Sequence, residues 1–176
     1  MNPASDKNLQ VSTPTDTTIV LTRTFKAARR LVWEAFFTPD KMRRWMLPPP
    51  GWTLTLCECE ARVGGEVRLA WKSAEADPVG TLQGVFTEVS PHEHAVHTET
   101  MVFGGWEGSG QVIGSLVEKH EFAEVASGGT GKSVTNMRIT QTYQSKEARD
   151  GALASGMDQG MEAGYQELDA VLAQLE

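Results

Sequence analysis

The longest helical pattern in this chain is SKEARDGALASGMDQGMEAGYQELDAVLAQL, residues 145–175. Ser145 is a suitable N-cap, and Glu147 falls in the first turn, where a negative charge is favourable. The following residues recur every three or four positions, as on one face of a helix: Leu153, Met157, Met161, Gly164, Leu168, Leu172 and Leu175. The pattern predicts one helix from Lys146 to about Leu175, about 45 Å long.

Three glycines follow one another at four-residue spacing in this stretch, at Gly156, Gly160 and Gly164. Each glycine inside a helix costs about 1 kcal/mol relative to alanine, so something has to approach the backbone closely. Tight packing against a sheet is one explanation, and space for a ligand is the other. Met157 and Met161 lie beside the glycines, and methionine adapts its shape to irregular partners, as in a deformable cavity wall.

The sequence before this helix is almost entirely strand-forming. Runs of β-formers occupy residues 17–25, 53–60, 66–73, 80–90, 94–101, 114–125 and 133–144. The breaks between the last six are short and rich in glycine and proline, which favours antiparallel neighbours. Strands and helices do not alternate, so the fold class is α+β. We expect a curved seven-stranded antiparallel sheet wrapped around the long C-terminal helix.

Two short helices are predicted after the first strand, in RRLVWEAFFTPDKMRRWMLPPPGW, residues 29–52. The first has one apolar face made of Leu31, Val32, Ala35 and Phe36. A second helix then begins, with Thr38 as N-cap, Pro39 as the first helical residue and Asp40 as an acidic residue in the first turn. The second helix runs to about Trp45, and the three prolines at 48–50 forbid further helix.

Length and charge limit the class of protein. The chain has 176 residues, which suits one domain, and a net charge of −7, which argues against nucleic acid and anionic membranes as partners. No apolar run approaches the roughly 18 residues of a membrane helix. Residues 1–16 lack the apolar core of a secretory signal and read as a disordered tail. We therefore expect a single domain over residues 17–176 and a cytoplasmic location.

The two cysteines, Cys57 and Cys59, share one face of a predicted strand. Their parallel direction does not favour a disulfide, and no second cysteine pair completes a metal site. They are predicted to be free thiols, as in a reducing cytoplasm, and no metal is expected. The stretch ASGGTGKS at 126–133 lies between strands, whereas a phosphate-binding loop opens a helix, so no cofactor is expected.

His97 and Glu99 lie two apart in a predicted strand and therefore share a face. On a concave face they form a candidate general acid–base pair, because a carboxylate raises the pKa of a nearby imidazole. An ordinary pair on the sheet surface is the alternative. No serine or cysteine nucleophile lies beside them in the sequence, so no catalytic residue is assigned.

Four segments together resemble a known family. They are LVWEAFFTPDKMRRWM (31–46), GWTLTLCECEARVGGEVRL (51–69), GVFTEVSPHEHAVHTET (84–100) and residues 145–175, which contain a GM..G core. Over about residues 17–175 the chain resembles the START-like superfamily, also called SRPBCC. Within it, the chain is similar to the bacterial group named for homology to the activator of heat-shock protein 90 ATPase.

The resemblance implies a helix-grip fold with an internal cavity between the sheet and the C-terminal helix. Related members bind lipids, hormones or polyketides, and a few catalyse reactions on them. The resemblance therefore implies binding of a small hydrophobic ligand without catalysis. A chaperone-associated interaction module and an enzyme acting on a hydrophobic small molecule are the alternatives. The chaperone-associated module would also imply a chaperone partner and a role in the stress response.

The cavity wall is predicted from alternation along the strands and from the helix stripe. Val67, Leu69 and Trp71 alternate with polar residues, which places them together on one face. The complete predicted ligand site is Val67, Leu69, Trp71, Phe86, Met101, Met157, Met161 and Tyr165. Trp33, Phe37 and Trp45 are candidates for its border or entrance. Trp106, in a glycine-rich loop, either folds over the pocket mouth or anchors its loop.

Overall fold

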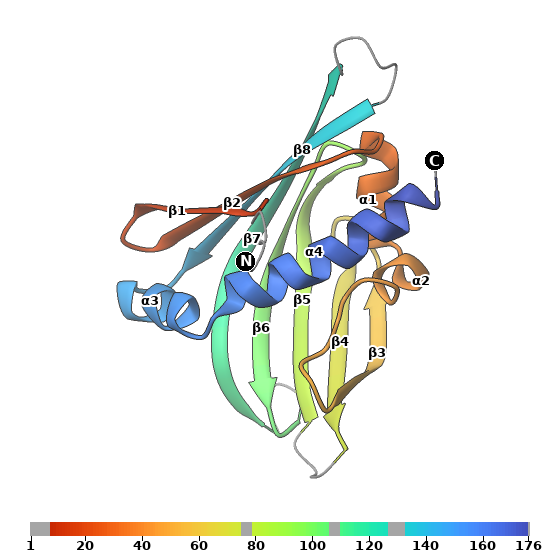
Figure 1. Ribbon diagram of the computed structural model, residues 1–176. Helices are drawn as coiled ribbons and strands as arrows, with labels where there is room; N and C mark the ends of the chain where they lie inside the picture. Colours follow the sequence, from red (N-terminus) through yellow and green to blue (C-terminus); the bar gives the residue numbers. More distant parts are fainter. Residues whose placement is uncertain (1–7, 75–78, 106–109, 127–132, 176) are drawn as a thin grey trace, which may run out of the picture.

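In the computed structural model, one antiparallel sheet carries helices on its concave side (Figure 1). The structure describes residues 8–74, 79–105, 110–126 and 133–175. Eight strands are joined in the order β1-β2-β8-β7-β6-β5-β4-β3. The strands β3 to β8 are therefore consecutive neighbours, and β2 adds to the far side of β8. The predicted α+β class and antiparallel sheet are confirmed.

The six strands predicted in the middle of the chain are all present, with ends shifted by at most a few residues. They are β3 (Trp52–Cys59), β4 (Glu66–Ser73), β5 (Val79–Ser90), β6 (His94–Phe103), β7 (Gln111–Ala126) and β8 (Ser133–Tyr143). The predicted first strand is β2, Thr18–Phe25, which pairs with β8. Glycine and proline between β-forming runs thus identified the strand ends correctly.

The sheet has eight strands and not seven, because residues predicted as a disordered tail form β1, Gln10–Thr15. β1 pairs antiparallel with β2, with Val11 opposite Leu21, and Leu9 just before it is buried. All six side chains of β1 are exposed, so the strand has no buried face to produce an alternating pattern. β1 is an edge strand held by backbone hydrogen bonds to β2. An edge strand also tolerates a proline such as Pro14, because proline cannot donate a backbone hydrogen bond.

The predicted C-terminal helix is two helices, α3 (Lys146–Ala154) and α4 (Met157–Ala173). Ser145 caps α3 as predicted, accepting a hydrogen bond from the backbone N–H of Ala148. Gly156 separates the helices with a φ of 76°, a left-handed conformation that side chains other than glycine adopt with strain. The apolar stripe continues across this break, so periodicity alone did not reveal it.

The two short helices follow β2 as predicted, with α1 at Arg29–Phe37 and α2 at Pro39–Met42. α2 ends at Met42 rather than near Trp45, because residues 43–45 continue as a turn. α1 packs against β7, β8 and α4, while α2 packs against β3. Among the described residues, no helix combines the length and the apolar character needed to cross a membrane.

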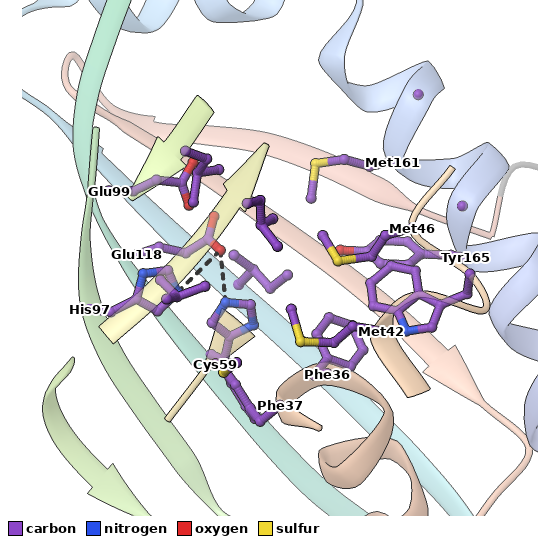
Figure 2. A pocket seen from close by; sticks show the side chains of 18 of the residues that line it. Phe36, Phe37, Met42, Met46, Cys59, His97, Glu99, Glu118, Met161 and Tyr165 are labelled. Carbon is purple, nitrogen blue, oxygen red and sulfur yellow. Dashed lines mark ion pairs between the residues drawn. The ribbon is translucent and has the colours of Figure 1, made fainter. Parts of the chain in front are cut away.

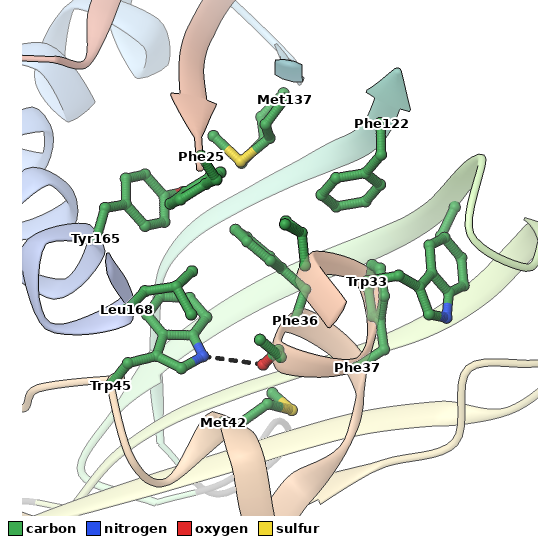
Figure 3. Close-up of a cluster of buried hydrophobic side chains, with 14 of the residues drawn as sticks. Phe25, Trp33, Phe36, Phe37, Met42, Trp45, Phe122, Met137, Tyr165 and Leu168 are labelled. Carbon is green, nitrogen blue, oxygen red and sulfur yellow. Dashed lines mark hydrogen bonds between the residues drawn. The ribbon is translucent and has the colours of Figure 1, made fainter. Parts of the chain in front are cut away.

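Aromatic side chains form the core where α1 meets α4 and the sheet (Figure 3). Phe36 of α1 lies with its ring centroid 5.0 Å from that of Trp45 and 5.8 Å from that of Tyr165. Trp45 also donates a hydrogen bond of 2.9 Å from Nε1 to the Ala35 carbonyl oxygen. This cluster fixes α4 above the sheet and determines where the remaining space lies.

Candidate functional site

A cavity of about 330 Å³ lies between the concave face of the sheet and α4. Its walls come from α1 and α2, from the strands β3 to β8, and from one face of α4. Most lining side chains are apolar, and Figure 2 shows Met42, Met46 and Tyr165 across the space from Glu118 and His97. Ligand sites of proteins usually have this form, with apolar walls and few polar groups.

Seven of the eight residues predicted from the sequence lie on this wall. They are Val67, Leu69 and Trp71 of β4, Phe86 of β5, and Met157, Met161 and Tyr165 of α4. Met101 is the exception and is 39% exposed. The ladder between β6 and β7 shifts register between Met101 and Val102, and Val102 is fully buried instead. The extra residue at this bulge is Ile113 of β7, opposite the end of β6 where Met101 lies.

The aromatic residues of the two short helices divide into core and wall. Phe37 and Trp45 line the cavity, as expected for its border. Trp33 does not, because its ring packs in the core at 4.5 Å from Phe37 and 5.8 Å from Phe122. Trp106, the predicted loop residue, lies outside the described residues.

The opening of the cavity is indicated by its most exposed lining residues. Leu47, after α2, is 55% exposed, and Gly160 of α4 is exposed as well. Both belong to the wall although both reach the solvent. The cavity therefore reaches the solvent beside Gly160 of α4 and Leu47, in the segment that follows α2.

The three evenly spaced glycines have three different roles. A Cβ added to Gly164 would lie 3.3 Å from the Trp45 carbonyl oxygen, so this glycine allows close packing. A Cβ at Gly160 would meet nothing within 4 Å, and this glycine borders the cavity. Gly156 adopts the left-handed conformation that separates α3 from α4. Close packing therefore explains Gly164, while Gly160 faces open space at the cavity.

A polar patch interrupts the apolar wall where β6 and β7 run side by side. His97 and Glu99 share the concave face, as predicted, and both line the cavity. Sequence reasoning missed Glu118 and His120, which β7 places on the same face. Their spacing of two residues was a signal for a shared face, but only the register sets Glu118 directly opposite His97.

The Glu118 carboxylate is the centre of this patch. Its Oε1 lies 2.7 Å from His120 Nε2 and 3.8 Å from His97 Nε2. Its Oε2 accepts a hydrogen bond of 2.6 Å from Gln141 Nε2, and Tyr143 donates one of 2.9 Å to Gln141 Oε1. The carboxylate is therefore held in one orientation by groups on three strands.

The charges in this patch affect one another strongly. Burial opposes ionisation of Glu118, but the two imidazoles and the hydrogen bonds from His120 and Gln141 lower its pKa. Burial lowers the pKa of His97. Burial, together with the negative charge of Glu118, raises the pKa of Glu99 well above its ordinary value. The patch thus pairs a Glu118 that ionises readily with a Glu99 that holds its proton more strongly than an ordinary carboxyl group does.

The cysteines are free, with Cys57 buried and Cys59 half-buried. Cys59 lies on the cavity wall, a role that the sequence did not predict. Burial raises the pKa of its thiol to about 12, so the group is protonated and unreactive at neutral pH. Within the cavity it acts as a small apolar group.

Comparison with known proteins gives a match over most of the chain. The model of the family described as Activator of Hsp90 ATPase homolog 1-like protein matches residues 26–173. A protein of known crystal structure from Rhodobacter sphaeroides is 28% identical, with a TM-score of 0.76, covering 96% of this chain and 99% of that chain. No curated protein matches this sequence.

Two further crystal structures share the fold at lower identity. One, from Mycobacterium smegmatis, is 21% identical with a TM-score of 0.74, covering 95% of this chain and 98% of that chain. The other, from Nitrosomonas europaea, is 20% identical with a TM-score of 0.72, covering 93% of this chain and 100% of that chain. At these identities the likeness concerns the fold alone.

Proposed function

The chain belongs to the family of Activator of Hsp90 ATPase homolog 1-like proteins, within the SRPBCC superfamily, and we propose that it binds a small hydrophobic ligand between the sheet and α4. The observation that carries this proposal is the cavity of about 330 Å³ with its opening beside Gly160. Its volume is at the lower end of the range of about 300–1,000 Å³ that ligand pockets occupy.

The composition of the wall supports a ligand that is mainly apolar. Aromatic and methionine side chains surround most of the space, and methionine adapts to ligands of different shape. Met157 and Met161 are half-buried on α4, so they are accessible to a molecule that enters beside the helix. Burying apolar surface there contributes about 25 cal/mol per Å² of ligand area, which supplies the main driving force.

The polar patch supports a ligand with one polar group. The raised pKa of Glu99 favours its protonated form, which donates a hydrogen bond, while the ionised Glu118 only accepts. A carboxylate or phosphate on the ligand would meet the negative charge of Glu118 without a neighbouring lysine or arginine on the described cavity wall. We therefore propose a neutral molecule with a hydroxyl, carbonyl or amide at one end.

Two measurements on the purified chain test this proposal. Native mass spectrometry is expected to reveal a co-purified adduct of small-molecule mass, and N-phenyl-1-naphthylamine, a neutral fluorescent probe, is expected to bind at one site per chain. Met161→Asn should weaken probe binding several-fold, because it places an amide in the apolar wall. Met101→Asn makes the same chemical change at an exposed residue outside the wall and should leave probe binding unchanged.

The comparison of these two variants distinguishes cavity binding from nonspecific adsorption. An equal effect of the two substitutions on probe fluorescence, or no effect of either, would mean that the probe does not bind in the cavity. Absence of probe binding in the unmodified chain, together with absence of any adduct, would contradict the proposed function.

A further inference from the structure

The imidazoles of His97 and His120 and the carboxylate of Glu118 converge on one point beside the cavity, as Figure 2 shows for His97 and Glu118. One ligand-type atom from each residue lies within 4.8 Å of the others. Two ligand atoms bound to a tetrahedral Zn²⁺ at about 2.0–2.1 Å are about 3.3 Å apart. The distances of 2.7 Å and 3.8 Å from Glu118 Oε1 to the two Nε2 atoms lie on either side of that value.

The three side chains are held by a rigid part of the fold. His97 and Glu118 are a directly opposed pair on β6 and β7, and His120 follows on the same face of β7. Their side chains are only 6%, 10% and 7% exposed. Neighbouring central strands therefore hold the three side chains close together before any ion binds.

The surroundings of His97 fix its free nitrogen toward Glu118. Its Nδ1 lies 3.0 Å from the Thr98 carbonyl oxygen, which only accepts, so Nδ1 carries the proton. A neutral His97 therefore presents an unprotonated Nε2 to a carboxylate oxygen, and two lone pairs face each other. Metal-binding histidines typically donate their other nitrogen in this manner, and a cation between the two groups would satisfy both.

The Thr98 carbonyl occupies its position because of a glycine on the neighbouring strand. A Cβ added to Gly84 of β5 would lie 1.7 Å from that carbonyl oxygen, which no side chain permits. The ladder between β5 and β6 is irregular there, with a register shift between Phe86 and Glu88. The backbone of β5 thus leaves room for the carbonyl that orients His97.

The other two ligands also depend on their neighbours. Gln141 holds Oε2 of Glu118 and leaves Oε1 toward the histidines. His120 Nδ1 is buried without a hydrogen-bond partner among the described residues, with the rings of Phe36 and Phe37 beside it. Of the two nitrogens of His120, only Nε2 therefore has a polar interaction, and it is directed at the centre of the cluster.

We propose that His97, Glu118 and His120 bind one divalent transition-metal ion, with Zn²⁺ as the ion best suited to two imidazoles and one carboxylate. Three protein ligands leave a coordination position open, and the cluster borders the cavity, so a polar atom of a bound molecule completes the shell. This site goes beyond the proposed function, because an ion can bind here whether or not the cavity accepts an apolar ligand.

The full chain, treated with chelator and titrated with Zn²⁺ in a calorimeter, tests the proposal. We expect one ion per chain and an affinity at least about tenfold weaker in Glu118→Gln, which keeps the size of the side chain but removes its charge. His94→Ala is the matched control, because His94 and Glu88 form a similar pair at 3.8 Å on an exposed surface. That variant should bind Zn²⁺ as the unmodified chain does.

Two further measurements keep the outcome clear if a variant folds poorly. Co²⁺ bound to the unmodified chain should give the visible absorption of a tetrahedral nitrogen–oxygen site, without the intense near-ultraviolet absorption of thiolate ligands. A Cys57→Ala/Cys59→Ala double variant should retain Zn²⁺ binding. Absence of binding in the unmodified chain, thiolate absorption with Co²⁺, or undiminished affinity in folded Glu118→Gln would overturn the proposal.

The same samples separate this proposal from the proposed function. Probe binding without Zn²⁺ binding would remove the metal site and leave the apolar cavity. Zn²⁺ binding without probe binding would support the metal site and contradict the apolar ligand.

Discussion

Nε of Arg23 on β2 lies 3.2 Å from Oε2 of Glu162 on α4, and both side chains are buried. The remaining guanidinium nitrogens donate to Asp169 at 3.0 Å and 2.7 Å, and the group stacks 4.7 Å above the Phe25 ring. The helix that covers the cavity is therefore attached to the sheet by a charged group inside the core. A buried cation of this kind is stable only while its partners remain.

Glu162→Ala should lower the free energy of unfolding by about 3–5 kcal/mol, because it leaves the buried Arg23 with a single partially exposed carboxylate. Urea denaturation measures the difference. Glu167→Ala, an exposed position on the same helix, should change it by less than about 0.5 kcal/mol. Similar losses in both variants would contradict the role assigned to the pair.

Gly156→Ala should destabilise the chain by about 1–2 kcal/mol, because alanine at a φ of 76° places Cβ against the following carbonyl. Gly151→Ala is the opposite case, since Gly151 is an exposed residue inside α3 and an added Cβ meets nothing within 4 Å. It should stabilise by up to about 1 kcal/mol. Thermal unfolding of both variants checks the sign, and a stabilising Gly156→Ala would mean that α3 and α4 are continuous.

Gly160→Leu should weaken binding of the neutral probe several-fold without lowering the free energy of unfolding. The new side chain enters open space at the cavity wall, and leucine favours a helix more than glycine does. Gly164→Leu, in contrast, should lower the free energy of unfolding by about 1–3 kcal/mol, because Trp45 already packs against Gly164. Unchanged probe affinity with a lower urea midpoint in Gly160→Leu would show that Gly160 packs against protein and not against a ligand.

The Cys59 thiol gives a prediction for pH dependence. Since burial raises its pKa to about 12, the thiolate fraction in the folded chain should grow about tenfold per pH unit between pH 8 and 10. The rate of alkylation in a Cys57→Ala variant should follow this slope, and the neutral probe should slow it. A rate that levels off near pH 9, where an unperturbed thiol is largely ionised, would indicate reaction through an opened form.

Most of the fold could be predicted because its information is local. Glycine and proline separate the strands β3 to β8, and β-branched residues fill them. β1 could not be predicted in this way, because its stability comes from hydrogen bonds to β2 while its side chains remain exposed. The break at Gly156 was also hidden, because an apolar stripe with helical spacing carries no information about φ at one residue.

The site was predictable to the extent that it depends on alternation within a strand or a helix. Val67, Leu69 and the methionines of α4 followed from such patterns. Met101 did not, because both faces of β6 carry mixed residues and the strand's sequence does not show which of them line the cavity. Glu118 lies opposite His97 because of the register between β6 and β7. The sequence of either strand alone does not specify this register.

The pairing of β2 with β8 has a consequence for how the chain folds during synthesis. Phe25 is opposite Thr135, and Thr18 is opposite Thr142, so the partners are separated by most of the chain. The hairpins from β3 to β8 close over short loops, whereas β2 has only the exposed edge strand β1 beside it until β8 has emerged from the ribosome. Contacts between such distant segments form late, because closing the long intervening loop costs entropy before any contact compensates. The apolar strand β2, made near the start of synthesis, is therefore among the last to be buried, and its exposure lasts for most of translation.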